Sequence, residues 1–301
     1  MYLQSTIRKR IQVEGLGLHK GEPASLTFCP APEGTGVHFV RRDLEGEPWI
    51  SPEAQFVQAT KLATTLGSDY FSVSTVEHCL SAVAALRIDN LIIELNGPEI
   101  PICDGSAKEF YDALMKVGIV EQEQPRQYCR IVKPVYFGDG EKHAYIVPYN
   151  GLRITCEIDF DHSEIGQQKI DIDINPHSFG KEIANARTFG FVKDVEQLHA
   201  AGLALGGSYQ NAIILGEDVV LNEEGLRWPD EFVRHKALDA VGDISTLGMP
   251  LLGHIILYKA GHDLMNKLIQ KLLSSPESYK KMELAGGLGD RAAHQKELWG
   301  I

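Results

Sequence analysis

The spacing of apolar residues along the chain predicts a fold that mixes sheets with helices. Residues 2–60 consist mostly of short apolar runs broken by glycine and proline, which is typical of strands. Over 76–86 the apolar residues recur every three or four positions behind a Ser-Thr pair, which predicts a capped helix. A buried strand at 91–95 and a second helix at 104–117 follow.

The same order of elements recurs in the second half of the chain. Residues 122–126 are polar, contain a proline and show no period, so we interpret them as a linker. After them the pattern predicts strands at 131–137, 143–148, 152–160 and 170–174, a helix at 230–247, a strand at 254–258 and a helix at 261–273. The recurrence indicates an internal duplication, although helix–strand–helix blocks also recur by chance. We therefore expect an α+β fold of two similar domains, each a β-sheet with two helices.

One segment, residues 189–216, has no counterpart in the first half. Its pattern predicts a βαβ insert: a strand, a short helix, a glycine-rich turn and a second strand. Composition alone favours an ordinary buried element over an apolar passage beside a site. The predicted domains are 1–121 and 127–275, the second containing the insert, followed by a C-terminal extension at 276–301 whose role the sequence does not indicate.

Composition narrows the class of protein. The 301 residues carry a net charge of −12, which argues against a broad nucleic-acid surface but not against a small anionic substrate. The five cysteines are scattered and form no Cys-x-x-Cys pair, so we expect a reducing, cytoplasmic environment. Neither a secretory signal nor a transmembrane segment is predicted, and peripheral contact with a membrane is left open.

A helix and its counterpart in the first half supply a candidate metal site. His235, Asp239 and Asp243 are spaced by four residues and project from one side of a predicted helix. His78 occupies the equivalent place in the first half, so pairing of the halves would bring both histidines to their interface, where small-molecule sites tend to form. Two imidazoles and one carboxylate suit a catalytic zinc ion with an open corner, and iron(II) uses a similar set. Taken alone, His235 and Asp239 would more often be an exposed ion pair.

Further polar residues near these positions have both a chemical and an ordinary interpretation. Glu77 could act as a general base or simply lie on a helix surface. His262 begins the last helix, where the dipole disfavours an imidazolium, so a catalytic acid there would need a carboxylate such as Asp243. Thr188 could donate to an oxyanion, although most strand threonines do not. Lys236 could bind a phosphate or remain solvated.

Several common catalytic motifs are missing from the sequence. It contains no His-Glu-x-x-His, no Gly-x-Ser-x-Gly, no P-loop and no dinucleotide-binding Gly-x-Gly-x-x-Gly in a βαβ setting. Standard zinc peptidases, serine hydrolases of the nucleophile-elbow type and nucleotide-dependent enzymes of these classes are therefore disfavoured.

An ordered series of motifs resembles the UDP-3-O-acyl-N-acetylglucosamine deacetylase family, the zinc amidases of lipid A synthesis. The motifs extend from about residue 7 to 275 and include Gly15-Leu-Gly-Leu-His19, Ser74-Thr-Val-Glu-His78, Asp104-Gly-Ser106, Ala186-Arg-Thr-Phe-Gly-Phe191, Leu205-Gly-Gly-Ser208, Phe232-Val-Arg-His-Lys236, Leu238-Asp239, Gly242-Asp243 and Gly261-His262. The resemblance implies that the helices of both domains are sandwiched between the two sheets. It also implies a cytoplasmic enzyme, which we expect to be a monomer.

By motif position, the resemblance implies a role for each polar residue of the site. One zinc ion, or iron(II) in its place, would be held by His78, His235 and Asp239. The catalytic residues would be Glu77 as general base, His262 as general acid tuned by Asp243, Thr188 as the oxyanion-stabilising hydroxyl and Lys236 as a cationic contact.

The resemblance also reverses the preference that composition gave for the insert, because the family has its acyl-chain passage there. The lining positions would be Val192, Val195, Leu198, Ala204, Ser208, Tyr209, Ala212 and Ile214, preceded by Phe191. Phe160 corresponds to the residue that packs on the uracil ring, and Lys259, with Asp159 and His162, would face the nucleotide. His19 and Phe189 would lie near the sugar or the start of the acyl chain.

The expected reaction is hydrolysis of the N-acetyl group of a UDP-linked acylated glucosamine. Two alternatives remain at this point: another metalloenzyme, such as a different amidohydrolase or an iron oxygenase, and a sugar-nucleotide or lipid-binding protein without catalysis. Metal analysis with an acetate-release assay separates the first, and binding without turnover would support the second. The chain departs from some family members at 61–65, where Ala63 and Thr65 fall in a region that carries cysteine in those proteins.

Overall fold

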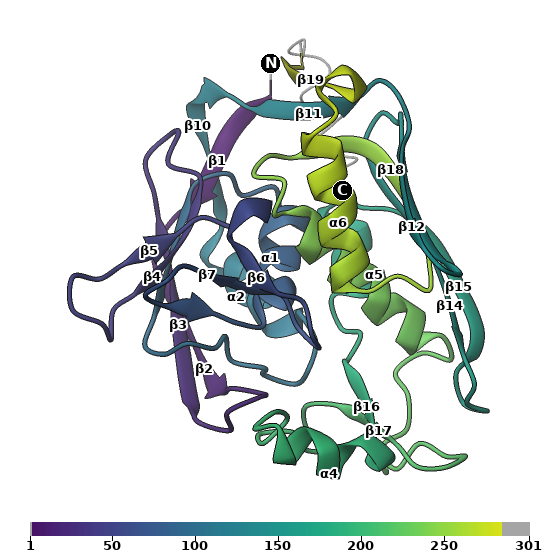
Figure 1. The fold of residues 1–301 in the computed structure, drawn as a ribbon. Helices are drawn as coiled ribbons and strands as arrows, with labels where there is room; N and C mark the ends of the chain where they lie inside the picture. The colour runs from purple at the N-terminus through teal and green to yellow at the C-terminus, as the bar shows by residue number, and fades with distance from the viewer. Residues whose placement is uncertain (1, 285–301) are drawn as a thin grey trace.

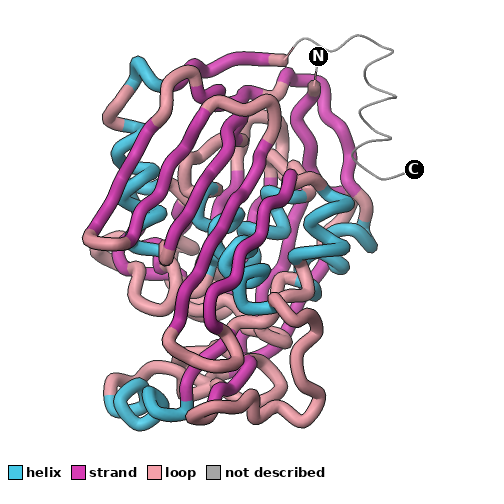
Figure 2. Tube along the Cα trace, turned by 90° about the vertical axis from the view of Figure 1, so that its right-hand side faces the viewer, coloured by secondary structure: helices cyan, strands magenta, loops and turns pink. Residues whose placement is uncertain are grey.

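The computed structural model describes residues 2–284, and it places the main helices between two β-sheets (Figure 1). The helices of this inner layer are α1 (Val76–Ala85), α2 (Lys108–Val117), α5 (Glu231–Ile244) and α6 (His262–Leu273). A view turned by 90° shows the strands of the second sheet lying across the helices (Figure 2). The predicted α+β class is confirmed, and so is the arrangement of helices between sheets.

The two main sheets share one order of strands. The first runs β2 (Ile11–Leu16), β3 (Pro23–Pro30), β9 (Leu91–Leu95), β4 (Val37–Arg41) and β5 (Trp49–Ile50). The second contains, in the equivalent places, β12 (Val135–Asp139), β13 (Lys142–Val147), β18 (Leu251–Tyr258), β14 (Leu152–Phe160) and β15 (Gly166–Asp173). Among these five strands of each sheet, the third and fourth are parallel and the other neighbours are antiparallel. This agreement, strand by strand, supports the duplication predicted from the sequence.

Two polar segments that were predicted to lie outside the two domains contain strands. Residues 122–126, predicted as a linker, lie mostly in β10 (Ile119–Pro125), which pairs antiparallel with β1 (Leu3–Ile7). The predicted extension starts with structure that belongs to the second sheet, because β19 (Tyr279–Glu283) pairs with β11 (Gln127–Ile131). The rest of that extension, 285–301, lies outside the described residues. The strand predicted at 131–137 is in fact the end of β11 and the start of β12.

The insert has the predicted βαβ form and lies at one end of the molecule, below the two sheets in Figure 1. It consists of β16 (Phe189–Phe191), α4 (Val192–Ala200) and β17 (Ile213–Leu215), and its two strands are parallel.

The remaining elements are small. A three-stranded sheet is formed by β6 (Val57–Ala59), β7 (Thr65–Gly67) and β8 (Ser72–Val73). The short helical turns are η1 (Ala54–Phe56), α3 (Pro176–Ser178), η2 (Phe179–Ile183) and η3 (Pro276–Ser278).

A close crossing of α1 and α5 positions the first turn of α1 against the middle of α5. The two helices pack against each other, and Leu80 of α1 and Val241 of α5 are both buried. A Cβ on Gly242 would lie only 2.0 Å from the carbonyl oxygen of Glu77, so only glycine allows this approach. The crossing therefore sets the distance between the predicted metal ligands of the two halves.

Membrane-spanning helices are not found between residues 2 and 284, where each helix is too short or too polar to cross a bilayer.

Candidate metal centre and active site

Helices α1 and α5 bring the three predicted metal ligands into one buried cluster. Asp239 Oδ1 lies 3.7 Å from His78 Nε2 and 3.3 Å from His235 Nε2. The two imidazole rings meet edge to face with their centroids 5.0 Å apart. One donor atom from each residue lies within 4.8 Å of the others, which is compatible with a single shared ion.

The protonation states and the unpaired atoms of this cluster fit a divalent cation. Asp239 Oδ1 is buried and accepts no hydrogen bond from any described residue. Burial and the neighbouring His235 lower the pKa of His78 to about 3, and burial also lowers the pKa of His235. Burial alone would raise the pKa of Asp239, but His235 and Lys236 hold it below its ordinary range. Neutral imidazoles and an ionised carboxylate are the forms that bind a metal.

Contacts behind the ligands fix their orientation. His235 Nδ1 lies 3.0 Å from the carbonyl oxygen of Ala186, so this nitrogen carries the proton and Nε2 presents its lone pair to the cluster. Lys236 Nζ donates to Asp239 Oδ2 at 2.7 Å, which leaves Oδ1 free for an ion. The lysine also lies 5.6 Å from the ring centre of Phe189. In this structure Lys236 therefore holds a ligand in addition to lying at the edge of the site.

The side chains of Glu77 and His262 face each other next to the cluster of predicted metal ligands. Glu77 is 2% exposed, and burial raises the pKa of its carboxyl to about 7. His262 Nε2 lies 3.8 Å from Glu77 Oε1, and its Nδ1 lies 2.8 Å from Asp243 Oδ2. Burial alone would lower the pKa of His262, but the charges of Asp243 and Glu77 raise it to about 10. A carboxyl group with a pKa near 7 thus faces an imidazole that is protonated at neutral pH.

The segment that carries Thr188 is anchored from both sides. The Thr188 amide donates to Gly105 O at 2.8 Å, and its carbonyl accepts from the amide of Ile213 at 2.8 Å. The preceding residue, Arg187, is 2% exposed and its guanidinium donates to Glu231 Oε1 at 2.9 Å. Because Glu231 is the first residue of α5, the pair ties this segment to the helix that carries two of the predicted metal ligands.

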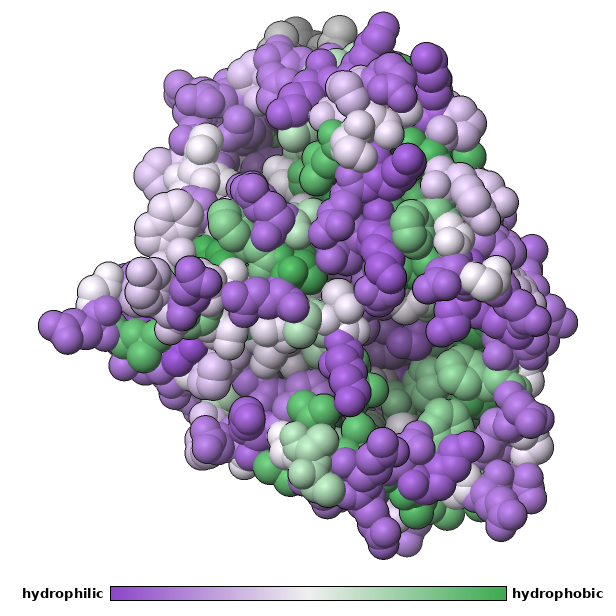
Figure 3. Space-filling model, viewed as in Figure 1, coloured by the Kyte–Doolittle hydropathy of each residue, from purple (hydrophilic) through white to green (hydrophobic). Residues whose placement is uncertain are grey.

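Aromatic side chains connect the metal centre to the end of the second sheet. Phe189 lies 6.4 Å from the ring of His235 and 5.7 Å from that of Phe160, and Phe160 lies 6.2 Å from Phe191. The space-filling view shows an apolar area between the second sheet and the insert (Figure 3). The structure thus groups the aromatic residues that were predicted to contact the substrate.

The polar residues predicted to face a nucleotide lie beyond this aromatic group. Lys259 Nζ pairs with Asp159 Oδ2 at 2.9 Å. The imidazole of His162 lies 5.7 Å from the ring of Phe191. Asp159 and His162 lie next to Phe160 in the sequence, and within residues 2–284 no hydrogen bond or ion pair joins these three polar residues to His78, His235 or Asp239.

His19 is buried where the insert rests on the first half. Its amide donates to Glu99 Oε1 at 2.7 Å, and its Nδ1 accepts from the amide of Ala204 at 3.4 Å. Burial lowers the pKa of His19, so the ring is neutral and its Nε2 carries a proton that has no partner among the described residues. The insert is held close to this loop, since a Cβ on Gly206 would lie 2.3 Å from Gly17 O.

The predicted acyl-passage residues are spread over the insert and differ in exposure. Val192 is 45% exposed and Tyr209 49% exposed, whereas Ala212 is 6% exposed. Those of intermediate or partial exposure are Val195, Leu198, Ala204, Ser208 and Ile214. Helix α4 has no fully buried residue, so its apolar positions are available on the surface. Their role as a passage stays a prediction.

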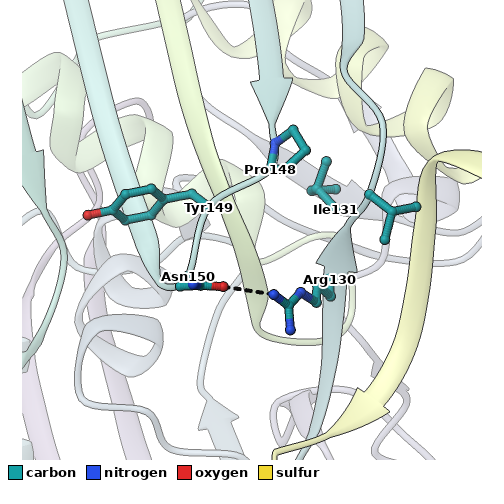
Figure 4. Close-up of a pocket in the computed structure, with 6 residues that line it drawn as sticks. Arg130, Ile131, Pro148, Tyr149 and Asn150 are labelled. Atoms are coloured by element: carbon teal, nitrogen blue, oxygen red, sulfur yellow. Dashed lines mark hydrogen bonds between the residues drawn. The ribbon is translucent and has the colours of Figure 1, made fainter.

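A separate hollow of about 590 Å³ lies on the second half, away from the residues described above. It is lined by Arg130, Ile131, Val132, Pro148, Tyr149 and Asn150, and Arg130 donates to Asn150 Oδ1 across it at 2.8 Å (Figure 4). None of the predicted catalytic or metal-binding residues lines it.

Sequence reasoning missed three residues that hold the site together. Thr64 contacts both Glu77 and Asp243, Glu99 accepts from the His19 loop, and Glu231 pairs with Arg187. Arg187 lies inside a motif that was noted, Ala186–Phe191, but its residue type does not reveal its partner. For Thr64 no local signal existed, because its partner Asp243 is 179 positions away.

The sequence was compared with families and proteins of known identity. Residues 4–274 match the family described as UDP-3-O-acyl N-acetylglycosamine deacetylase. A relative from Bdellovibrio bacteriovorus, named UDP-3-O-acyl-N-acetylglucosamine deacetylase, is 61% identical over 290 residues, covering 96% of both chains. Relatives of the same name from Myxococcus xanthus and Oleidesulfovibrio alaskensis are 48% and 49% identical, over 96% and 94% of this chain and 94% and 93% of theirs.

Proposed function

The chain belongs to the UDP-3-O-acyl N-acetylglycosamine deacetylase family, and on that premise we propose that it hydrolyses the N-acetyl amide of UDP-3-O-acyl-N-acetylglucosamine in lipid A biosynthesis. Water adds across the amide C–N bond. Its oxygen goes to the acetyl carbon and a proton goes to the nitrogen. The products are acetate and UDP-3-O-acyl-glucosamine.

One observation carries the proposal: a buried two-histidine, one-carboxylate cluster lies beside a proton acceptor and a proton donor. Glu77 and His262 have pKa values shifted in the directions that these tasks need, to about 7 and about 10. A protein that only bound a sugar nucleotide would need neither group at these positions, and an oxygenase would have no use for the acid. Amide hydrolysis uses both.

The ligands His78, His235 and Asp239 would hold one zinc ion, because two imidazole nitrogens and one carboxylate oxygen with an open fourth corner form a common catalytic zinc site. When bound there, such an ion polarises a carbonyl and makes water a stronger acid. The donor set also suits iron(II), so metal analysis of the purified protein decides between the two.

Glu77 acts as the general base in this proposal. Its Oε2 is occupied by the amide of Thr64 at 3.0 Å, so Oε1, which faces His262, is the oxygen that accepts the proton from the attacking water. A carboxylate whose pKa is about 7 can both take up a proton and release it near neutral pH. Burial is what raises the pKa to this value.

His262 acts as the general acid. Asp243 bonds its Nδ1 at 2.8 Å and favours the imidazolium, so Nε2 carries a proton that can pass to the leaving amine nitrogen. Thr188 would donate its hydroxyl to the developing oxyanion, because its segment is fixed next to His235 through Ala186. Lys236 would hold Asp239 in its ligating position and add positive charge at the edge of the site.

The substrate would extend from the metal centre along the two surfaces that meet there. We assign the uracil ring to Phe160, and the nucleotide's polar groups to Lys259, with Asp159 and His162 nearby. We assign the acyl chain to the insert, along its apolar positions from Phe191 onward. His19, with an unpaired N–H on a neutral ring, can donate to a sugar oxygen.

Mass-resolved deacetylation by protein of known metal content tests this function. The expected result is loss of one acetyl group from UDP-3-O-acyl-N-acetylglucosamine by the wild type and a fall of about 100-fold or more in kcat for Glu77→Ala, with its metal retained. Glu109→Ala is the matched control, because Glu109 is also the acid in the first turn of a helix but is exposed. Absence of acetate release by the metal-loaded wild type would refute the function, and normal turnover by Glu77→Ala would refute the assigned base.

A further inference from the structure

We propose that Thr64 is a positioning residue that holds the general base of one half and the acid pair of the other half at a fixed separation. This inference rests on the proposed function of Glu77 and His262. Among residues 2–284, the Thr64 side chain makes no hydrogen bond to a proposed metal ligand or to the imidazole of His262, and its one side-chain hydrogen bond goes to Asp243.

On one side, the backbone of Thr64 organises the start of α1. Its amide donates to Glu77 Oε2 at 3.0 Å, and its carbonyl accepts from the amide of Val76 at 3.3 Å. Val76 is the first residue of α1 and its amide would otherwise be one of the unpaired donors of a helix start. The preceding residue, Thr75, has a left-handed backbone with φ of 61°, and its side chain makes no capping bond. Thr64 therefore replaces the missing cap.

On the other side, the side chain of Thr64 reaches the acid pair. Its hydroxyl donates to Asp243 Oδ1 at 2.7 Å, while Asp243 Oδ2 lies 2.8 Å from His262 Nδ1. Each carboxylate oxygen of Asp243 thus accepts one hydrogen bond, one from Thr64 and one from His262. Rotation of this carboxylate would break both contacts, so the Thr64 hydroxyl fixes the plane in which His262 is held.

Burial makes this connection stiff. Thr64 is 3% exposed and Asp243 4% exposed. The small gap behind them, lined by Val57, Thr246 and Asn266 together with Thr64, Asp243 and His262, leaves no space for a water molecule. In Thr64→Val a methyl group fills the place of the hydroxyl, so water cannot take that place and the carboxylate oxygen would lose this partner.

The consequence for catalysis is geometric. Glu77 and Asp243 belong to different halves of the chain, and Thr64 is one residue that bonds to both. A hydrogen bond to a buried carboxylate is strong enough that its loss changes a rate by about 10- to 100-fold if the loss displaces a reacting group. The backbone contacts to α1 would survive a change of side chain, so the two connections can be separated by substitution.

The test compares Thr64→Val, which keeps the shape and removes the hydroxyl, with Thr64→Ser, which keeps the hydroxyl and removes the methyl. We expect kcat to fall about 10- to 100-fold in Thr64→Val, with KM and metal content close to those of the wild type. The melting temperature should fall by a few degrees, because a buried carboxylate oxygen loses its donor. Thr64→Ser should retain most of kcat. Thr65→Val, at the neighbouring half-buried threonine, is the control and should behave as wild type.

A double-mutant cycle makes the test specific to Asp243. In an Asp243→Asn background, Thr64→Val should lower kcat by less than about twofold, because the bond that it removes no longer holds a carboxylate. Wild-type kcat in Thr64→Val would overturn the inference. So would a loss of kcat in which metal also disappears, or a full additional loss in the Asp243→Asn background. A metal-loaded wild type that releases no acetate would instead refute the proposed function on which the inference rests.

Discussion

The raised pKa of His262 can be tested by removing the charge that raises it. Asp243→Asn keeps the size of the side chain and one oxygen, but it removes the negative charge 2.8 Å from His262 Nδ1. In metal-free protein, where only side-chain charges act on the imidazole, we expect the pKa of His262 to fall from about 10 to near or below its ordinary value of 6.5. Burial continues to lower it in the variant, and only Glu77 still raises it strongly.

The expected change in protonation follows from these values. At about pH 7.5 the wild-type imidazole, with a pKa of about 10, is almost entirely cationic. With a pKa of 6.5 only about a tenth of the molecules would carry the proton at that pH. If His262 must donate this proton, the loss of the Asp243 charge also lowers kcat of the metal-loaded variant relative to the wild type.

The sign of the effect on stability is also fixed. Because the folded pKa of His262 lies above the unfolded one, its contribution to the free energy of unfolding is complete below about pH 6.5 and is lost as the pH rises through about 10. The metal-free wild type should therefore lose stability over this window, and Asp243→Asn should lose less over the same window.

Two measurements check this reasoning. Histidine ring resonances of metal-free protein, followed by NMR as a function of pH, give the pKa of His262 directly, with His262→Gln used to assign the signal. Denaturant unfolding at several pH values gives the stability change. A His262 signal that titrates at the same pH in wild type and Asp243→Asn would refute the role of Asp243, whatever happens to the rate.

Three further predictions concern the metal, the buried ion pair and the insert. Zinc at a thousandfold excess over its Kd should stabilise the wild type by about 4 kcal/mol in thermal unfolding, and His78→Ala should lose most of this response; an unchanged response would exclude His78 as a ligand. Glu231→Gln should lower the free energy of unfolding in urea by about 3–5 kcal/mol, because it leaves buried Arg187 incompletely paired. Glu224, the other partner of this arginine, has a side chain that is 57% exposed, so Glu224→Gln should lower the free energy of unfolding by less than about 1 kcal/mol. Gly206→Ala should loosen the insert, which limited proteolysis and a raised KM would report, while Gly97→Ala, where a Cβ meets nothing within 4 Å, should do neither.

The sequence predicted the fold where the elements bury an apolar face. Helices α1, α5 and α6 and strand β9 have such a face, and their predicted positions agree with the structure to within a few residues. Strands β10, β15 and β19 were missed or shortened because they are edge strands. The burial of β15 alternates between intermediate and exposed along its length, so it presents no apolar face to detect.

The site was predictable to the extent that the duplication was visible. Equivalent places in the two halves put His78 opposite His235, and the structure brings their rings to 5.0 Å. The contacts that hold the site, such as Thr64 with Asp243, depend on a pairing between segments that share no pattern. Their residue types are ordinary, and only the folded chain places them together.

The matching strand orders of the two halves bear on how a site of this kind can arise. His78 and His235 are equivalent, but the residue four places after His78 is Ala82, whereas the one after His235 is Asp239. Glu77 likewise corresponds to Arg234. A symmetric homodimer of one half would carry the same residue at both equivalent places. It could therefore offer two matched histidines, but it could not place a glutamate on one helix and an arginine at the same place on the other. In a single chain that contains both copies, the two helices need not match. One helix can then carry the proposed base and the other the proposed third metal ligand.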